Sequence, residues 1–488
     1  MSTAKSRPRG LRIAIIGAGP GGLCMAIQLK QAGFDDIVML EKGSGVGGTW
    51  YHNRYPGCAC DIPSHLYSFS FEIKHDWSRS YAAQPEILAY MEALAEKYEL
   101  LPHCRFASEV RSATWDDDRA CWTLALGAGE AVEADVVVSA LGMFNELAWP
   151  DIEGRDSFTG TSFHSARWNW DHDLTGEAVG VIGSAGSAVQ FVPEIVKQAG
   201  QVYLFQRTAN WVLPKEDTPF TDEDLALFRE DPNRAPAARQ EIFDNIDGGL
   251  TFDNPALLAK LEASGLAAIE EVENPVLRRE LRPKHPLGCK RPLFSNYYYA
   301  AFNQPNLELV TDSVERITAD AVVTADGKAR HLDTLIMATG FLTTKYLSAI
   351  DVRGRHGQRI DEAWNDGALA YLGITTSGFP NLFMLYGPNT NNGSILYMIE
   401  SQVDYALRQI QRIANEGLAW IDVKPEPMAH YNEEIQRSIA RVEVWGAECN
   451  GYYRSPTGRI VTQWPHSMTE FQERTRKPDS EIYEVALL

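Results

Sequence analysis

The 488-residue sequence predicts an α/β fold in which a unit of strand, glycine-rich turn, helix and strand occurs twice. The first unit spans residues 11–41 with the turn GAGPGG, and the second begins at Ala178 with the turn GSAGSA. Between residues 215 and 284 the sequence becomes charged, rich in Ala and Leu and interrupted by prolines, which is typical of several short helices. We therefore expect two Rossmann-like units with a helical insertion in the second.

Composition narrows the class of protein. Hydrophobic residues make up 44% and charged residues 23% of the chain, which is globular composition for two or three domains. The formal net charge of −20 leaves no broad basic surface, so we expect no nucleic-acid partner. The basic and apolar start imitates a signal peptide, but the same residues form a better strand, turn and helix, and no apolar run is long enough to cross a bilayer. We expect a soluble cytoplasmic protein that does not contact membranes.

The cysteines indicate reduced thiols and not a disulfide framework. Their number is odd and they are scattered, at residues 24, 58, 60, 104, 121, 289 and 449. We expect buried free thiols and a fold that needs no disulfide. Cys58 and Cys60 are interpreted as small residues in a turn, and because no further Cys/His pair completes a zinc site, no metal is expected.

The first glycine turn has the pattern of a dinucleotide site. The expected elements are a strand at 11–16, a helix that ends near residue 31 and a strand at 37–41. Gly17, Gly19 and Gly22 stand where such a unit needs a tight turn, a close approach of backbone to pyrophosphate, and close helix–strand packing. Glu41 ends the second strand, where an acid accepts hydrogen bonds from a ribose. The four residues together predict a bound dinucleotide.

The second glycine turn departs from that pattern. It has Gly183, Ala185 and Ala188 at the three fingerprint positions, with Gly186 displaced by one place. The methyl group of Ala185 stands where a phosphate approaches the backbone, whereas alanine at the third position is commonly tolerated. Ser184 and Ser187 complete the turn and are candidate cofactor contacts. A structural unit that has lost its ligand stays open as the alternative.

The strand after this turn ends in basic and polar residues where an acid would favour NAD. Arg207, with Thr208 beside it, can pair with a 2′-phosphate, so the second unit suits NADPH better than NADH. Two nucleotide sites in one chain usually mean that electrons pass between them, which suggests tightly bound FAD and exchangeable NADPH. The expected division is an FAD-binding domain of residues 1–148 and 338–488, an NADPH-binding domain of 149–214 and 285–337, and an insertion of 215–284.

Six further motifs resemble those of one family. They are GGTWYHNRYPGCACD (47–61), FTGTSFHSARWN (158–169), FQRTANWVLP (205–214), GCKRPLFSNYYY (288–299), ATGF (338–341) and LFMLYGPNTNNGSILYMIESQ (382–402). Together they resemble the class B flavoprotein monooxygenases, and among these the type I Baeyer–Villiger monooxygenases. The resemblance runs in consistent order from residue 11 to about residue 470.

The resemblance implies a reaction. Members of the family reduce FAD with NADPH, form a C4a-peroxyflavin with O2, and insert one oxygen atom beside a ketone carbonyl to give an ester or a lactone. The implied substrate is a small apolar ketone. A flavin monooxygenase that oxidises sulfur or nitrogen nucleophiles is the first alternative. An NADPH oxidase or reductase that releases hydrogen peroxide is the second, and a flavoprotein that retains only the fold is a further one.

The resemblance also implies site residues. Gly48, Thr49 and Trp50 would contact the flavin cofactor, and Asp61 would lie near the flavin and pair with Arg291. A guanidinium stays charged at every relevant pH and offers several donors, so Arg291 suits the stabilisation of an anionic oxygen. Asp61 would fix its orientation. The preceding residue, Lys290, is assigned to the 2′-phosphate with Arg207.

Three C-terminal and linker features complete the expectations. The short fingerprint has His164 and Trp168 as supporting residues, with Asn169 where Pro or Asp is usual, and Asn can cap the turn much as Asp does. Asn389 in GPNT is a candidate cofactor contact before a helix expected at 394–416, whose N-terminus could favour negative charge. Channel and core positions both stay open for the aromatic residues Tyr452, Tyr453 and Trp464, and monomer and dimer both stay open.

Overall fold

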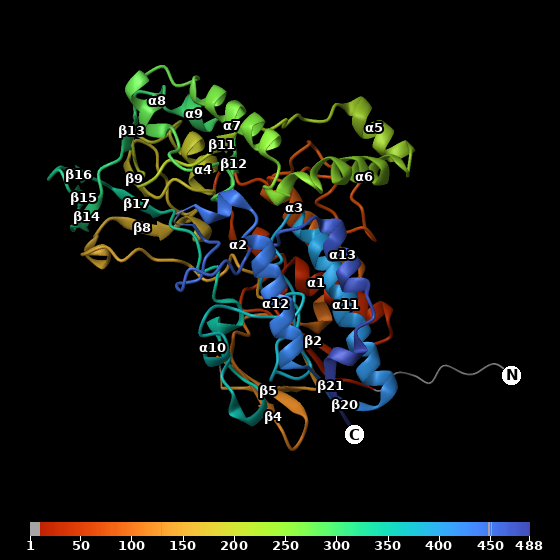
Figure 1. Ribbon diagram of the computed structural model, residues 1–488. Helices are drawn as coiled ribbons and strands as arrows, with labels where there is room; N and C mark the ends of the chain where they lie inside the picture. Colours follow the sequence, from red (N-terminus) through yellow and green to blue (C-terminus); the bar gives the residue numbers. More distant parts are fainter. Residues whose placement is uncertain (1–9, 128, 448, 450) are drawn as a thin grey trace.

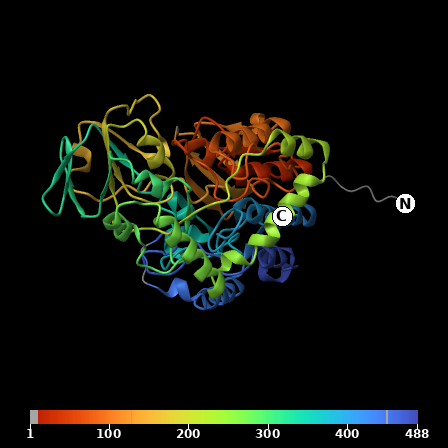
Figure 2. The ribbon, with the colours of Figure 1, turned by 90° about the horizontal axis from the view of Figure 1, so that it is seen from above.

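A computed structural model describes residues 10–127, 129–447, 449 and 451–488 (Figure 1). The chain forms two Rossmann-like sheet units, each a five-stranded parallel sheet, which confirms the α/β fold. Seen from above, the unit coloured yellow to teal lies at one end and the unit coloured red, orange and blue at the other (Figure 2).

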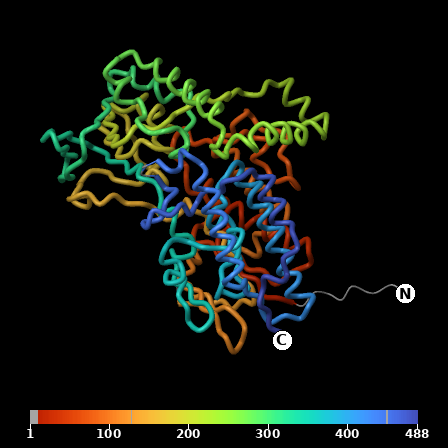
Figure 3. The backbone as a smooth tube through the Cα atoms, in the orientation of Figure 1, coloured from red at the N-terminus to blue at the C-terminus, as the bar shows by residue number. Residues whose placement is uncertain are grey.

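The first sheet has the order β19-β7-β1-β2-β3, and all of its neighbouring strands are parallel. Its strands are β1 (Ile13–Ile16), β2 (Ile37–Leu40), β3 (Cys104–Arg105), β7 (Val136–Ser139) and β19 (Leu382–Met384). Helix α1 (Pro20–Gln31) follows β1, as the glycine turn predicts. The long helix α11 (Ile395–Glu416) packs on α1, so the C-terminal part of the chain returns over the N-terminal part (Figure 3).

The second sheet has the order β13-β10-β9-β17-β8 and is also parallel throughout. Its strands are β8 (Thr161–His164), β9 (Ala178–Ile182), β10 (Gln201–Phe205), β13 (Leu307–Val310) and β17 (Thr334–Met337). Helix α4 (Ala188–Ile195) follows the second glycine turn and buries an apolar face against the sheet. The repeated strand–turn–helix pattern in the sequence therefore produces two equivalent units.

The insertion consists of helices α5 (Asp222–Glu230), α6 (Arg234–Ile246), α7 (Pro255–Ile269) and α8 (Pro275–Leu281). Thr221, Asn254 and Asn274 cap α5, α7 and α8 through side-chain oxygens, which explains where these three helices begin. A half-buried ion pair of 3.3 Å between Arg239 and Glu400 joins α6 to α11. The helical insertion predicted from the prolines and alanines is confirmed: α6 contacts the first sheet unit through this ion pair, whereas α7 and α8 bury Ile269 and Leu281 in the core of the second.

The remaining elements complete the two units and, among the described residues, form four smaller sheets, of which two are antiparallel, one is mixed and one is a parallel pair. The helices are α2 (Thr49–His52), α3 (Gln84–Lys97), α9 (Tyr298–Ala301), α10 (Ile360–Ala363), α12 (Pro425–Ile439) and α13 (Met468–Arg476). The strands are β4 (Val110–Asp116), β5 (Cys121–Leu126), β6 (Ala131–Ala134), β11 (Val212–Leu213), β12 (Leu293–Phe294), β14 (Val314–Ile317), β15 (Ala321–Thr324), β16 (Ala329–His331), β18 (Asp351–Arg353), β20 (Leu418–Val423) and β21 (Tyr483–Leu487). Within the described ranges, every helix is too short or too polar to cross a membrane.

One expectation about the cysteines was wrong. Cys289 and Cys449 form a disulfide with their Cα atoms 6.1 Å apart, although 160 residues separate them in the chain. Sequence spacing carries no information about this contact, because the fold alone brings the two segments together. The other five cysteines are free thiols, as expected, and burial raises the pKa of Cys58 to about 12.

Candidate active site

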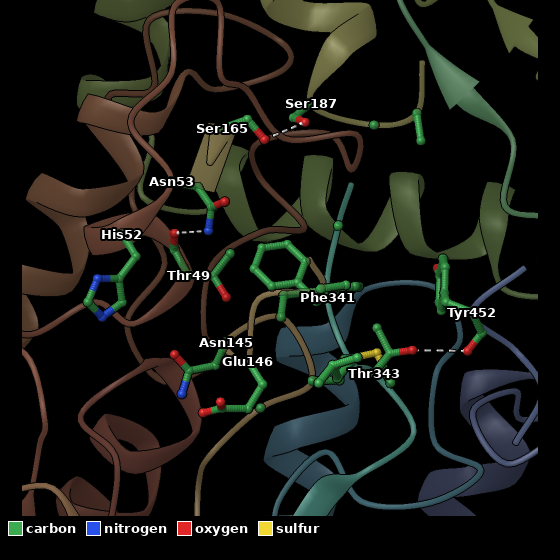
Figure 4. Close-up of a pocket in the computed structure, with 18 of the residues that line it drawn as sticks. Thr49, His52, Asn53, Asn145, Glu146, Ser165, Ser187, Phe341, Thr343 and Tyr452 are labelled. Carbon is green, nitrogen blue, oxygen red and sulfur yellow. Dashed lines mark hydrogen bonds between the residues drawn. The ribbon is translucent and has the colours of Figure 1, made fainter. Parts of the chain in front are cut away.

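Both glycine turns open into one cavity of about 1380 Å³. The turn after β1 and the turn after β9 both line it, together with residues near 340, 390 and 452. Figure 4 shows Ser187, Phe341 and Tyr452 among the lining residues. A single connected cavity brings any ligands on the two turns within reach of each other. The two nucleotide sites predicted from separate parts of the sequence therefore share one space.

The first turn is shaped for close backbone contacts. Gly17 has φ +104°, and a Cβ there would lie 2.7 Å from the carbonyl oxygen of Ala140. A Cβ on Gly22 would overlap the carbonyl oxygen of Gly17, and one on Gly19 would lie 3.4 Å from the Cα of Gly48. Helix α1 begins without a side-chain cap and with Pro20, and Gly19, Pro20 and Gly21 line the cavity, so the N-terminus of the helix is placed to receive an anionic pyrophosphate. The local geometry thus fits the phosphate cradle of a dinucleotide.

Glu41 stands beside this cradle with its carboxylate buried. One oxygen accepts a hydrogen bond of 2.8 Å from the Ala18 amide, and the other accepts one of 2.7 Å from the Gly43 amide. Glu41 also lines the cavity. A carboxylate has about four acceptor positions, so it retains capacity for ribose hydroxyls after holding the two loops in place.

The segment after Gly48 closes the same end of the cavity. Gly48 has φ +54°, a backbone conformation that suits glycine, and Thr49 begins the short helix α2. Trp50 donates its indole N–H to the Tyr67 hydroxyl at 3.0 Å. The Asn53 amide donates to the Thr49 carbonyl at 2.9 Å (Figure 4). All of these residues line the cavity, in agreement with the position expected for flavin contacts.

In the second turn, Ala185 and Gly186 are exposed and line the cavity. Gly183 adopts φ +106°, while Ser184 is buried and its carbonyl accepts a hydrogen bond of 3.0 Å from Asn210. The Ser187 and Ser165 hydroxyls lie 3.0 Å apart (Figure 4). The turn keeps the positive φ of a nucleotide loop at Gly183, and Ala185 is exposed at the cavity.

We expect Ala185→Gly to lower the Michaelis constant for NADPH about threefold, equivalent to about 0.6 kcal/mol of binding, because the methyl group stands where a phosphate approaches. Steady-state kinetics with NADPH varied measure this effect. Gly248→Ala is the control, since this residue does not line the cavity and a Cβ there meets no protein atom within 4 Å. A Michaelis constant unchanged by Ala185→Gly would show that the methyl group does not meet the phosphate.

Two cations lie beside the second turn. Arg207 and Thr208 are exposed and Lys290 is half-buried, and all three line the cavity. Burial and the positive charge of Arg207 lower the pKa of Lys290, so the two cations are close enough to repel each other. Within the described part of the chain neither forms an ion pair with a carboxylate. An anion between them would relieve this repulsion, and a 2′-phosphate has the required charge.

Asp61 and Arg291 form an ion pair inside the cavity. The Nε and one terminal nitrogen of Arg291 donate to the same Asp61 oxygen at 3.1 and 2.6 Å. Each side chain is 33% exposed, and this exposed part lines the cavity. The negative charge of Asp61 raises the pKa of Arg291 well above its ordinary value. The pair thus presents a permanently charged guanidinium, with further N–H donors, to any bound ligand.

The sequence interpretation missed some residues around this pair. The Tyr386 hydroxyl donates to Asn391 at 2.8 Å, and both residues line the cavity. Burial raises the pKa of Tyr452 while Arg291 opposes that shift, so the phenol lies close to the ion pair. The Thr343 hydroxyl donates to the Tyr452 carbonyl at 3.2 Å (Figure 4). Tyr386 directly precedes the GPNT motif, and this position is the signal in the sequence that could have identified it as a cavity residue.

The short fingerprint forms support behind the cavity. The Nδ1 of His164 accepts a hydrogen bond of 3.1 Å from the Ala166 amide, and burial lowers its pKa to about 4. Trp168 packs on Phe191 of α4, with ring centroids 5.1 Å apart. Asn169 accepts from the Asp171 amide at 3.2 Å, so the asparagine caps the turn as expected. His164 and Trp168 do not line the cavity.

One residue, Asn389, lies elsewhere than the pattern suggests, and the structure separates the three aromatic residues that were left open between channel and core. Asn389 is buried and donates to the carbonyls of Ile460 and Gln463 at 3.1 and 3.0 Å, and it does not line the cavity. This differs from the expected cofactor contact, because its amide is consumed in holding the 460–463 segment. Trp464 is fully buried and is a core residue, whereas Tyr452 and Tyr453 line the cavity.

The start of α11 also differs in detail. The helix begins at Ile395, one residue later than expected, and its N-cap Ser394 makes no side-chain capping hydrogen bond. Gly393 and Ile395 at this end line the cavity. The expected approach of a helix N-terminus to the cavity is therefore present, with its first N–H groups uncapped by the Ser394 side chain.

Comparisons with known proteins identify the family. A family model described as pyridine nucleotide-disulphide oxidoreductase matches residues 14–221. A Baeyer–Villiger monooxygenase of Pseudomonas aeruginosa is 40% identical over 97% of this chain and 91% of its own length. The chain belongs to the Baeyer–Villiger monooxygenase family. The match confirms the resemblance seen in the motifs from residue 11 onwards.

Two solved structures of monooxygenases share the architecture. A structure described as OTEMO in complex with FAD and NADP has a TM-score of 0.87 and 30% identity, and the match covers 99% of this chain and all of the other. An ε-caprolactone-bound cyclohexanone monooxygenase has a TM-score of 0.86 and 29% identity over 98% of this chain and 99% of the other. This Baeyer–Villiger monooxygenase is accordingly an NADPH-consuming, FAD-dependent enzyme, and the cofactors predicted from the two glycine turns are confirmed.

Proposed function

We propose that the cavity holds FAD against the first glycine turn and NADPH against the second, with the Asp61–Arg291 pair at the reacting centre and a small apolar ketone as substrate. The ion pair carries this proposal, because it is a charged pair within the same cavity as both turns. FAD bound there would supply the redox chemistry of the reaction, in which NADPH and a proton provide two electrons, one oxygen atom of O2 enters the ketone to give an ester or a lactone, and the other becomes water.

The chain's own residues supply binding and charge. Arg291 directs N–H donors at an oxygen atom that carries negative charge, and it remains protonated throughout because Asp61 raises its pKa. Asp61 accepts two of its hydrogen bonds and holds the plane of the guanidinium. A cation whose orientation is fixed stabilises developing charge without reorganisation, which is usually the largest single contribution to the rate of such a reaction.

The substrate class follows from the lining. Several apolar side chains line the cavity together with the ion pair: Ile62, Leu293, Phe294, Ile395, Ile399 and Tyr453. Few of these groups offer a hydrogen bond, so an apolar ketone whose only polar atom is the carbonyl oxygen fits better than a polar metabolite. Cyclohexanone, phenylacetone and thioanisole, assayed in parallel for NADPH-dependent product formation, test this. Preferential oxidation of thioanisole would favour the sulfur-oxidising alternative.

We propose the same domain division as the sequence suggests, with FAD on the first sheet and NADPH on the second. Strands β1, β2, β3 and β7 come from residues before 148 and β19 from residues after 338, while the second sheet uses residues 161–337. A cytoplasmic location suits an enzyme that consumes NADPH. Neither nucleic acid nor a metal ion has a part in this reaction scheme.

Arg207→Ala should raise the Michaelis constant for NADPH about 10- to 100-fold, since a hydrogen bond to a charged group contributes about 1.5–3 kcal/mol. The constant for NADH should change little, because NADH has no 2′-phosphate. Initial rates with each nucleotide measure the ratio, and Thr208→Ala, beside it, should give a smaller change in the same direction. An equal loss with both nucleotides would place Arg207 elsewhere on the cofactor.

A further inference from the structure

The segment that carries Arg291 is attached to the C-terminal part of the chain. Gly288, with φ +90°, accepts a hydrogen bond of 3.2 Å from the Trp445 indole. Cys289 follows at once and forms the disulfide with Cys449. The next two residues, Lys290 and Arg291, line the cavity. The disulfide therefore stands two residues from the guanidinium of the proposed reacting centre.

The partner segment also reaches the cavity. Gly451, Tyr452 and Tyr453 line it, starting two residues after Cys449. A Cβ on Gly451 would lie 3.4 Å from the Cγ of Lys290, so the two backbones approach closely at this point. The Trp445 ring packs on Tyr453, with centroids 6.5 Å apart. The disulfide thus joins two segments that line the cavity, one carrying Arg291 and the other Tyr452.

We propose that the Cys289–Cys449 disulfide is a positioning crosslink that sets the place of Arg291 and Tyr452, so that its reduction uncouples NADPH consumption from ketone oxidation. This inference rests on the proposed function of Arg291. The disulfide holds the Cα atoms of Cys289 and Cys449 6.1 Å apart. The two segments can therefore move relative to each other by only a fraction of that distance. Without it, the Trp445–Gly288 hydrogen bond and side-chain packing hold the same segments together. Oxygen transfer depends on accurate placement of the guanidinium, whereas oxidation of NADPH alone does not.

Breaking the disulfide requires a dithiol as reductant, and forming it again requires hydrogen peroxide as oxidant. Reduction by a dithiol adds two electrons and two protons, so the S–S bond breaks, two Cys thiols form, and the dithiol becomes a disulfide. Oxidation by hydrogen peroxide reverses this: two thiols and one peroxide give the disulfide and two water molecules. Peroxide is the product that the site releases when no ketone accepts the oxygen atom. Cys449 is half-buried and Cys289 is buried, so Cys449 offers the accessible sulfur.

The first test uses the purified full-length holoenzyme. Peptide mapping without reductant should show residues 289 and 449 in one crosslinked peptide. After treatment with dithiothreitol and its removal, the fraction of NADPH that ends as peroxide, with cyclohexanone or phenylacetone present, should rise roughly fivefold to tenfold, since small misplacements are costly to such reactions. Cys289→Ser/Cys449→Ser should show the raised fraction before treatment and no response to it. Cys104→Ser, at a half-buried free thiol, should behave like the unaltered chain.

A second readout does not depend on turnover. Calorimetric titration with NADP⁺ should give binding about fivefold weaker after reduction, because Lys290 adjoins Cys289 and coupling between such sites is typically about fivefold or more. Free thiols at both positions in the purified protein would overturn the proposal. So would a crosslinked protein in which neither the peroxide fraction nor NADP⁺ binding responds to reduction. If the unaltered enzyme oxidises no ketone but its NADP⁺ binding responds to reduction, the proposed function fails and the crosslink stands.

Discussion

Arg291→Ala is expected to lower the rate of ketone oxidation about 100- to 1000-fold, which is the range for removing a donor that stabilises an oxyanion. NADPH oxidation should continue, and most of the reducing equivalents should then appear as hydrogen peroxide. The reason is that the Arg291 guanidinium lies in the cavity and is held there by two hydrogen bonds to one Asp61 oxygen, of 2.6 and 3.1 Å. Ester formation, peroxide release and NADPH consumption measured in one reaction give the result.

Three variants make the comparison specific. Arg291→Lys keeps the charge but loses the fork of donors, so it should recover only part of the activity. Asp61→Asn keeps the size of the side chain and should reduce coupling less than Arg291→Ala does. Arg279→Ala removes an exposed arginine from α8 and should leave the kinetics unchanged. Wild-type ester yield from Arg291→Ala would contradict the proposed role.

Gly22→Ala is expected to remove FAD from the protein and to destabilise the first sheet unit. A Cβ at this position overlaps the carbonyl oxygen of Gly17, a backbone atom at the end of β1 that cannot move without disturbing the sheet. Overpacking of this kind costs about 1–3 kcal/mol in the free energy of unfolding. Because the phosphate cradle is the part displaced, FAD affinity should fall at least about tenfold, equivalent to about 1.4 kcal/mol.

The flavin absorbance of purified protein and the thermal midpoint with and without added FAD measure this effect. Gly248→Ala is the matched control, since a Cβ there meets no protein atom within 4 Å and the residue has right-handed helical φ and ψ. A Gly22→Ala protein that retains full flavin and an unchanged midpoint would show that α1 can shift away from β1. The proposal that contact with the Gly17 carbonyl requires glycine at residue 22 would then be wrong.

The sequence predicts the fold well where local geometry imposes a residue type. Gly17 and Gly22 are required by backbone contacts within one strand–turn–helix unit, so the sequence pattern and the structure agree. Asn389 was misplaced because an asparagine in a loop can serve a ligand or the backbone, and only the fold shows that the 460–463 carbonyls lie beside it. The disulfide was missed for the same reason: its 160-residue separation is closed by tertiary structure alone.

Partners of residues far apart in the chain were predictable only through the family resemblance. The pairing of Asp61 with Arg291 joins positions 230 residues apart, and no periodicity or spacing in the sequence indicates it. Tyr386 was left without a role and Tyr452 was left open between channel and core, because a tyrosine in a hydrophobic segment is equally suited to the core. Their place around the ion pair comes from β19, α11 and the C-terminal segment meeting at one end of the cavity.

The measurement that tests the central claim most directly is isotopic. The holoenzyme is supplied with NADPH, cyclohexanone or phenylacetone, and ¹⁸O-labelled O2, and the ester or lactone is analysed by mass spectrometry with NADPH consumption recorded. The account predicts one labelled oxygen atom in each product molecule and one NADPH consumed for each. Consumption of NADPH with labelled hydrogen peroxide as the only oxygenated product, for every ketone tried, would contradict it.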